Sequence, residues 1–185
     1  MNLPNKLSVL RIALVPVVVL LLYLPGDLCR WLAVAVFMAA AFTDYLDGHI
    51  ARKNGLVTDF GKFIDPVADK LLGLCTLIML CHEGLMASWA VCVILARELC
   101  VDGLRMIAVG KGKVIAASWW GKVKTVSQLG LILWQLVLRH PLTLRPAADP
   151  LGFVAALGTA WAVIITIVSG ADYFKKNGSV LLESK

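Results

Sequence analysis

Six long apolar stretches, separated by short polar segments, dominate the pattern of this chain. Each is about as long as the roughly 20 mainly apolar residues that a helix needs to cross a bilayer. A Pro-Gly-Asp turn signal at 25–27 follows the first stretch, and Pro141 and Pro150 bracket the connection before the last. The pattern predicts six transmembrane helices, over Ser8–Leu24, Leu28–Ile50, Phe60–Cys81, Met86–Val109, Ala116–Leu138 and Leu151–Tyr173.

The composition supports a membrane protein. Hydrophobic residues make up 59% of the 185 residues and charged residues only 16%, and the mean hydropathy is +0.82. A soluble domain is roughly half apolar and about a quarter charged. We therefore expect one all-α membrane domain over residues 1–185. Because no small-x-small cleavage site follows the first apolar stretch, we expect it to be retained as a helix.

The basic residues are distributed unevenly between the two ends of the predicted helices. If the N-terminus is cytoplasmic, fifteen of the eighteen fall on the cytoplasmic side, and only Arg30, Arg139 and Arg145 fall on the other. Cytoplasmic loops carry an excess of Lys and Arg, so we expect both termini in the cytoplasm and a multi-pass protein of the inner membrane. The net charge of +6 suggests anionic lipids or a polyanionic substrate as partners. No basic patch carries the interleaved aromatic residues of a nucleic-acid binder.

Four aspartates lie at helical spacing around the second connection. Asp44 and Asp47 are three residues apart near the end of the second predicted helix. Asp65 and Asp69 are four residues apart near the start of the third, so each pair shares a helix face. If the two faces meet near the cytoplasmic surface, the carboxylates would repel one another unless cations lie between them. Oxygen ligands favour hard divalent ions, so the pattern predicts Mg²⁺ or Mn²⁺, and a pair of such ions is familiar in phosphoryl chemistry.

Two glycines and an arginine stand between the aspartates. Gly48 and Gly61 leave open helix surface, which a headgroup could approach, or which could simply allow close helix packing. Arg52 follows Gly48 by one turn, and its planar guanidinium can hold a phosphate, although it could also be a cytoplasmic anchor. Charged groups at a membrane are costly, so a purely structural role for the whole set is not expected.

A second polar set begins inside the fourth predicted helix. Arg97 lies within this apolar stretch, where a charge must face a partner or a polar cavity. Adjacent helical residues point in different directions, so Glu98 is not expected to be its partner. The basic residues Arg105, Lys122 and Lys124 follow. The set predicts either an internal ion pair or an anion pocket, and the pocket would suit a phosphate-bearing acceptor such as glycerol 3-phosphate or an inositol phosphate better than serine or choline.

The first set resembles the signature D-x-x-D-G-x-x-A-R-x8-G-x-x-x-D-x-x-x-D of the CDP-alcohol phosphotransferase family. The chain matches every fixed position, namely Asp44, Asp47, Gly48, Ala51, Arg52, Gly61, Asp65 and Asp69. The resemblance extends to the six-helix layout. It implies that the hydroxyl of a small alcohol attacks a phosphate of a CDP-linked donor and that CMP leaves.

The resemblance also implies roles for individual residues. Asp44, Asp47 and Asp65 would hold two divalent metal ions, and Asp69 would complete the second ion's shell and act as general base. The CDP portion of the donor would contact Gly48, Arg52, Thr58 and Gly61. Asn5 and Ser8 would join them if the segment before the first helix lies across the mouth of the site. Otherwise Ser8 is an N-cap and the segment is a basic anchor.

Four further segments look like one bacterial branch of this family, in which the donor is CDP-diacylglycerol and the acceptor is glycerol 3-phosphate. They are Asn2–Arg11, Ala96–Glu98, Gly103–Arg105 and Trp120–Thr125. The branch implies a membrane homodimer that makes phosphatidylglycerophosphate. Its acceptor phosphate would be bound by Arg97, Arg105, Lys122, Lys124 and Thr125.

Two alternatives remain open on the sequence. One is the same chemistry with another acceptor, such as inositol phosphate, serine or phosphatidylglycerol. The other is a cation transporter whose acidic residues line an ion path. A transporter does not account for Gly48, Arg52 and Gly61 at their offsets, and it would place the acidic residues nearer the middle of the bilayer.

Overall fold

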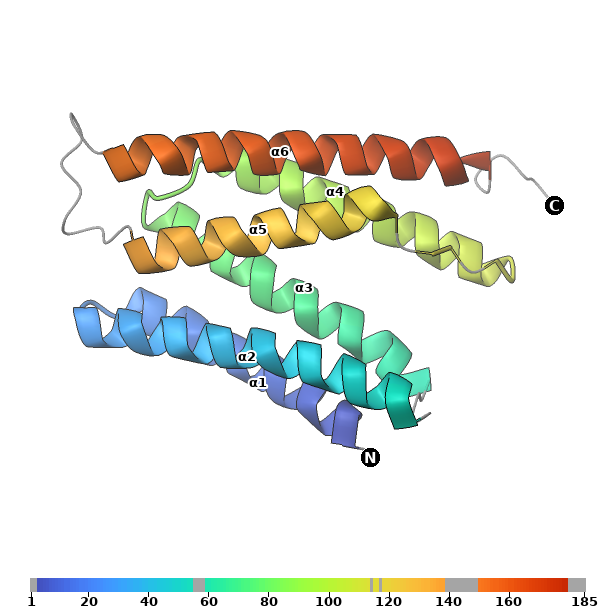
Figure 1. The fold of residues 1–185 in the computed structure, drawn as a ribbon, viewed down its shortest axis with the longest axis horizontal. Helices are drawn as coiled ribbons and strands as arrows, with labels where there is room; N and C mark the ends of the chain where they lie inside the picture. The colour runs from blue at the N-terminus through green and yellow to red at the C-terminus, as the bar shows by residue number, and fades with distance from the viewer. Residues whose placement is uncertain (1–2, 55–58, 114, 117, 139–149, 180–185) are drawn as a thin grey trace. The chain divides into compact units, whose positions relative to one another are not determined.

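The computed structural model describes residues 3–54, 59–113, 115–116, 118–138 and 150–179, and these form six α-helices (Figure 1). For residues 3, 4, 44–54, 59–63, 65, 66, 69, 138 and 150 the description covers the backbone alone. The prediction of an all-α chain is confirmed over the described residues, and each helix overlaps one of the six predicted stretches. In chain order they are α1 (Leu3–Tyr23), α2 (Asp27–Asn54), α3 (Asp59–His82), α4 (Ser88–Gly110), α5 (Trp119–Leu138) and α6 (Pro150–Asn177).

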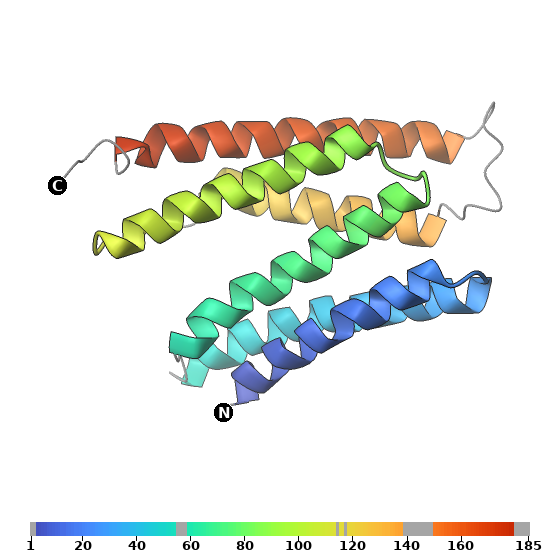
Figure 2. The same ribbon diagram turned by 180° about the vertical axis from the view of Figure 1, so that it is seen from behind.

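The helices form two compact units, Met1–Glu83 and Gly84–Lys185. In the first unit, α1 packs along both α2 and α3 (Figures 1 and 2). Val18 and Leu22 of α1 are buried, as are Ala33 and Ala40 of α2. Alanine at such positions lets two helix backbones approach closely, so the fit between α1 and α2 depends on small side chains as well as on large ones.

One end of the first unit is closed by polar and aromatic contacts. Gly26, with φ 120°, occupies the turn between α1 and α2, a backbone conformation that favours glycine. The Nη1 atom of Arg30 at the start of α2 lies 2.7 Å from Oε2 of Glu83, just after α3. The rings of Tyr23 and His82 stack with centroids 6.0 Å apart. These contacts join the end of α1 and the first turn of α2 to the end of α3.

In the second unit, α6 packs along both α4 and α5. Its core contains Ile94 and Leu104 from α4, Leu136 from α5, and Ala162 and Tyr173 from α6. Tyr173 is 1% exposed, so its phenolic hydroxyl needs a partner inside the unit. The core of this unit is therefore partly polar, and the polar part contains the charged residues described below.

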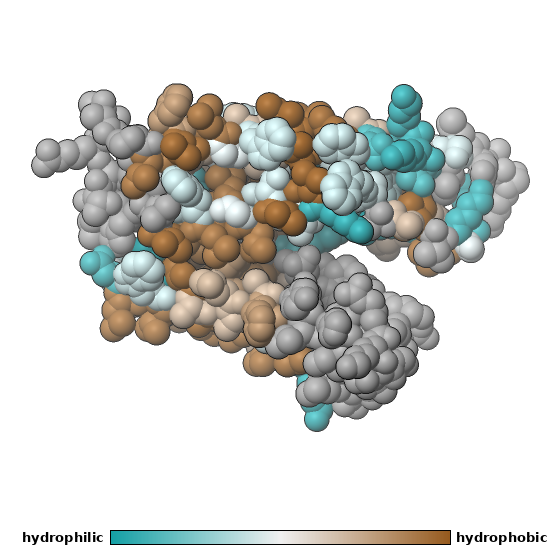
Figure 3. Space-filling view, in the orientation of Figure 1, coloured by the Kyte–Doolittle hydropathy of each residue, from teal (hydrophilic) through white to brown (hydrophobic). Residues whose placement is uncertain are grey.

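The outer faces of both units carry many large apolar side chains. Leu28, Trp31, Met106 and Phe153, for example, are each more than half exposed, and Figure 3 shows that much of the visible face of each unit is apolar. A water-soluble monomer rarely exposes apolar patches of this extent. Among the described residues, two helices have the length and hydropathy of membrane spans, Asn5–Tyr23 and Leu151–Asn177.

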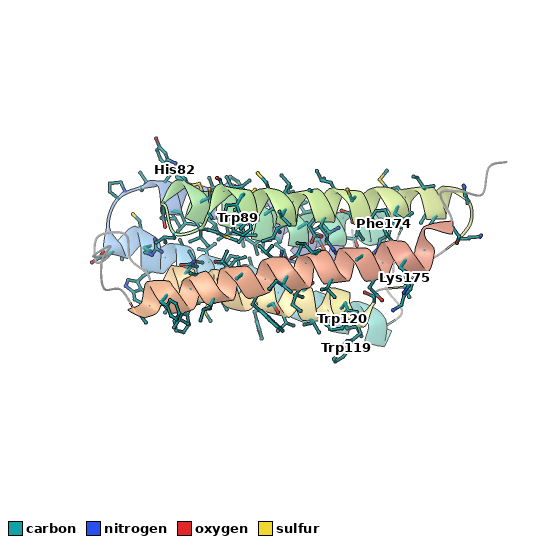
Figure 4. All side chains as sticks on the ribbon, turned by 90° about the horizontal axis from the view of Figure 1, so that it is seen from above. His82, Trp89, Trp119, Trp120, Phe174 and Lys175 are labelled. Atoms are coloured by element: carbon teal, nitrogen blue, oxygen red, sulfur yellow. The ribbon has the colours of Figure 1, made fainter. Side chains whose placement is uncertain are left out.

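Aromatic residues gather near the ends of the second unit. Figure 4 shows Trp119 and Trp120 at the start of α5, on the same end of the unit as Lys175 of α6. Trp89, at the start of α4, lies toward the other end, and it is 59% exposed. Tryptophan is enriched at both membrane–water interfaces, so this placement is that expected of a membrane-embedded bundle.

Candidate active site

The four aspartates lie on uninterrupted helix at one end of the first unit. Asp44 and Asp47 belong to the last three turns of α2, and Asp65 and Asp69 to the first three turns of α3. The expected spacings of three and four residues therefore hold along each helix axis, and each pair shares a face. Residues 55–58 join the two helices, so their ends lie at the same end of this unit (Figures 1 and 2). The side chains of the four aspartates lie outside the part of the chain that the structure describes, so the meeting of the two helix faces stays a prediction.

The motif residues between the aspartates are placed by their backbone. Gly48 and Arg52 lie on α2, one turn apart, and Gly61 lies in the first turn of α3. Thr58, expected to contact the donor or cap the third helix, falls outside the described residues. Carboxylates that share a face of a continuous helix are a donor set that fits a hard divalent cation. A site for a metal ion and a phosphate at this end of the unit therefore stays a prediction.

The N-terminal segment differs from the expectation. Helix α1 begins at Leu3, so Ser8 lies inside the helix and is not its N-cap. Pro4 is compatible with this early start because a proline is tolerated in the first helical turn. Asn5 and Ser8 are 5% and 0% exposed, so they lie on the inward face of α1. The buried stripe of α1 is therefore polar near its N-terminus and apolar further along.

Arg11 continues this inward polar face. Its side chain is fully buried, and Nε donates a hydrogen bond of 3.2 Å to the carbonyl oxygen of Ala40 on α2. For Arg11, this burial contradicts the alternative in which the N-terminal segment is a basic anchor at the membrane surface. A burial signal was present in the sequence, because Asn5, Ser8 and Arg11 recur at intervals of three residues, the spacing of one helix face.

The second polar set forms a buried cluster of side chains that come from three helices of the second unit. Glu98 of α4 is 4% exposed and accepts a short, charged hydrogen bond from Nζ of Lys124 on α5, which is 6% exposed. The same carboxylate oxygen lies 3.4 Å from Nη1 of Arg97. The Nη2 atom of Arg97 donates a hydrogen bond of 2.7 Å to Oγ of Ser169 on α6. Contact between Arg97 and Glu98 was not expected, and it arises because both side chains are long enough to bend around the helix.

Among the described side chains, the cluster contains two cations, Arg97 and Lys124, and one carboxylate, Glu98. The Nε atom of Arg97 is buried and has no hydrogen-bond partner among the described residues. A buried, incompletely bonded guanidinium is costly unless an anion joins it. Gly170 leaves room for the stem of Arg97, because a Cβ atom built there would lie 3.2 Å from its Cγ.

The remaining basic residues of the predicted pocket have different surroundings. The Nε atom of Arg105 donates a hydrogen bond of 2.9 Å to the hydroxyl of Tyr173, and its guanidinium lies over the same ring, 5.3 Å from the centroid. Lys122 is exposed. The hydroxyl of Thr125 donates a hydrogen bond of 3.1 Å to the carbonyl oxygen of Gly121, one turn earlier in α5.

The comparisons with known proteins identify the family. The family model described as CDP-alcohol phosphatidyltransferase matches residues 1–169. The chain belongs to this family. It is 42% identical to the CDP-diacylglycerol–glycerol-3-phosphate 3-phosphatidyltransferase of Bacillus subtilis, and the alignment covers 99% of this chain and 98% of that protein.

Two more relatives within the CDP-alcohol phosphatidyltransferase family carry names of the same kind. A probable phosphatidylglycerophosphate synthase of Mycobacterium tuberculosis is 40% identical, over 93% of this chain and 79% of that protein. The CDP-diacylglycerol–glycerol-3-phosphate 3-phosphatidyltransferase of Escherichia coli is 37% identical, over 88% of this chain and 91% of that protein. The chain is therefore a transferase, and the transporter alternative is set aside.

Sequence reasoning missed the partners that α6 supplies. Ser169 and Tyr173 bond Arg97 and Arg105, yet neither of these two residues was proposed for the site. A signal was present, because Thr166, Ser169 and Tyr173 follow one another at intervals of three and four residues in an otherwise apolar helix. Polar residues on one face of a membrane helix generally face the interior of a bundle.

Proposed function

We propose that this protein transfers the phosphatidyl group of CDP-diacylglycerol to a hydroxyl of glycerol 3-phosphate, giving phosphatidylglycerophosphate and CMP. The observation that carries the proposal is the extent of the likeness. Relatives named for this reaction align with 99% and 88% of the chain, and the whole family motif falls on the adjoining ends of α2 and α3. In the plain terms of the reaction, the chain is a phosphatidylglycerophosphate synthase.

The donor is assigned to the first unit. Asp44, Asp47 and Asp65 would hold two divalent metal ions, Mg²⁺ or Mn²⁺, and Asp69 would complete the coordination of the second ion. When bound, such ions neutralise the phosphate oxygens of the donor. Arg52 suits one of the donor phosphates because its guanidinium can form two parallel hydrogen bonds. The other proposed donor contacts are Gly48, Thr58, Gly61, Asn5 and Ser8. The inward, polar face of α1 supports the inclusion of Asn5 and Ser8.

The proton of the acceptor hydroxyl is assigned to Asp69. The hydroxyl oxygen forms a bond to the phosphorus that carries diacylglycerol, and the bond from that phosphorus to the CMP oxygen breaks. The electron pair leaves with CMP, and the hydroxyl proton passes to a carboxylate oxygen of Asp69. Asp69 is a reasonable base because it lies one turn beyond Asp65 on the same face of α3.

The acceptor is assigned to the second unit, where two buried or nearly buried cations among the described side chains support a site for a phosphate. Arg97 is the strongest candidate, because its guanidinium is mostly buried and Nε has no partner in the part of the chain that the structure describes. Lys124 lies in the same cluster. Arg105, Lys122 and Thr125 complete the proposed set, with Lys122 supplying charge from an exposed position. A phosphate-bearing acceptor suits these cations better than serine does.

The membrane arrangement completes the proposal. All six helices would span the inner membrane, with both termini and the carboxylates on the cytoplasmic side, because the basic residues concentrate there. The acyl chains of the donor would then stay in the bilayer while glycerol 3-phosphate and CMP exchange with the cytoplasm. Exposed tryptophans at both ends of the second unit support a spanning orientation. We also propose a homodimer, to which the apolar outer faces are suited.

The test is a transfer assay with purified protein in detergent micelles. CDP-diacylglycerol and Mg²⁺ or Mn²⁺ are supplied with glycerol 3-phosphate, inositol phosphate, serine or phosphatidylglycerol in turn, and released CMP and new lipid are measured. Product with glycerol 3-phosphate alone is the expected result. Product with a different acceptor alone would reject the proposed acceptor and keep the family chemistry. No CMP release with any acceptor, in protein that retains its helical content, would reject the transferase proposal itself.

A further inference from the structure

The Glu98 carboxylate occupies an unusual place for an acidic residue beside a proposed phosphate site. It lies within a mostly apolar bundle, is 4% exposed, and belongs to no position of the family motif. A carboxylate near a phosphate site would normally weaken binding by repulsion. Its presence therefore requires either a structural reason or a role in arranging the cations around it.

We propose that Glu98 is a positioning residue for the acceptor phosphate and that it acts through Lys124. The inference rests on the proposed function, since it assumes a phosphate-bearing acceptor at the Arg97 cluster. Glu98 on α4 and Lys124 on α5 are 26 residues apart in sequence and joined by a short hydrogen bond. Both residues are more than nine-tenths buried.

The bond limits the freedom of a side chain that is otherwise flexible. The lysine side chain is a flexible four-carbon stem that ends in an ammonium with three N–H donors. The hydrogen bond to Glu98 restricts where the ammonium lies and how it is oriented. A phosphate that arrives then meets a cation that is already ordered, so less conformational entropy is lost on binding.

The two cations of the cluster are positioned by different partners. Arg97 is held mainly by Ser169 of α6, at 2.7 Å, and its contact with Glu98 is longer, at 3.4 Å. Lys124 is held by Glu98. Glu98 also offsets one of the two positive charges, which allows the pair to lie close together inside the bundle. Loss of Glu98 should therefore release Lys124 more than Arg97.

The experiment is a double-mutant cycle on acceptor kinetics. Glu98→Gln, Lys124→Gln and the double variant are purified in detergent, and KM and kcat are measured for glycerol 3-phosphate and for CDP-diacylglycerol. We expect Glu98→Gln to raise the acceptor KM about ten- to a hundredfold, the range for a hydrogen bond to a charged group, and to change the donor KM less than about twofold. In the Lys124→Gln background, substitution of Glu98 should have no further effect on the acceptor KM, because the group it positions is gone.

The matched control is Glu83→Gln. Glu83 is another nearly buried carboxylate in an ion pair, with its side chain 11% exposed and 2.7 Å from Arg30 in the first unit. Its loss should lower thermal stability without a selective change in either KM. If Glu98→Gln does not fold, the comparison of the double variant with Lys124→Gln still tests the inference.

Three results would overturn the inference. They are an acceptor KM that is unchanged or lowered by Glu98→Gln, equal rises in both KM values, and effects that multiply in the double variant. The last would mean that Glu98 acts independently of Lys124. If the wild-type protein makes no product with glycerol 3-phosphate, the proposed function fails instead, and the cycle is then run with whichever phosphorylated acceptor gives product.

Discussion

The hydrogen bond from Arg97 to Ser169 offers a sharp test of the acceptor site. Ser169→Ala removes one oxygen atom from a fully buried position on α6 and leaves the backbone of a well-packed helix unchanged. The Nη2 donor of Arg97 then loses its 2.7 Å partner, while Nη1 keeps only its 3.4 Å contact with Glu98. The guanidinium becomes free to rotate away from the position it holds in the cluster.

The size of the effect follows from the charge on the donor. A hydrogen bond that involves a charged group is worth about 1.5–3 kcal/mol, and about 1.4 kcal/mol corresponds to a factor of ten. Because the stem of Arg97 remains packed against Gly170, some of its orientation survives. We therefore expect kcat/KM for glycerol 3-phosphate to fall about tenfold, at the lower end of that range, mainly through a higher acceptor KM.

The assay is CMP release with both substrates varied, and the control is Ser127→Ala. Ser127 also bonds across α5 and α6, accepting a 3.1 Å hydrogen bond from Nε1 of Trp161, but this bond is exposed and neither partner is charged. We expect this control to change kcat/KM for the acceptor less than about twofold, since no charged donor is involved. If Ser169→Ala matches the control, or if it raises the donor KM as much as the acceptor KM, the assignment of Arg97 to the acceptor is wrong.

Three further substitutions test other parts of the proposal. Gly170→Ala brings a methyl group to about 3.2 Å from Cγ of Arg97, so kcat/KM for the acceptor should fall about three- to tenfold. The control is Gly130→Ala, which should leave kcat/KM for the acceptor unchanged because Gly130 has open space around it. Glu83→Gln weakens the ion pair with the arginine at the start of α2 and should lower the free energy of unfolding by about 1–3 kcal/mol, measured by thermal unfolding in detergent. Asp69→Asn should abolish turnover and leave binding of CDP-diacylglycerol largely intact. Equilibrium binding of the donor and CMP release are measured on the same preparation. Near-normal turnover would remove Asp69 from the mechanism.

The helices themselves were largely predictable from the sequence, because apolar stretches of spanning length are a strong signal. The differences are at the ends. Helix α1 begins at Leu3 instead of Ser8, because the inward face continues through polar residues that a hydropathy pattern does not count. Helix α6 continues to Asn177, with Lys175 and Lys176 in its last turn, where positive charge interacts favourably with the helix dipole. Hydropathy therefore located each apolar segment and missed the polar turns that extend it.

The two parts of the candidate site differ in how far a sequence can reveal them. The aspartate motif lies on two consecutive helices joined by four residues, so spacing along the chain nearly determines which residues share a face. The second cluster joins three helices. Glu98 and Lys124 are 26 positions apart in the sequence, and Arg97 and Ser169 are 72 positions apart. Spacing within one helix could identify Arg97 as a charge in need of a partner, but its partners depend on which faces of α4, α5 and α6 pack together. Glu98 was not expected to contact Arg97 because adjacent helical residues point in different directions, and tertiary packing overrides that local rule. Ser169 was overlooked although the sequence places it on a polar stripe of its helix.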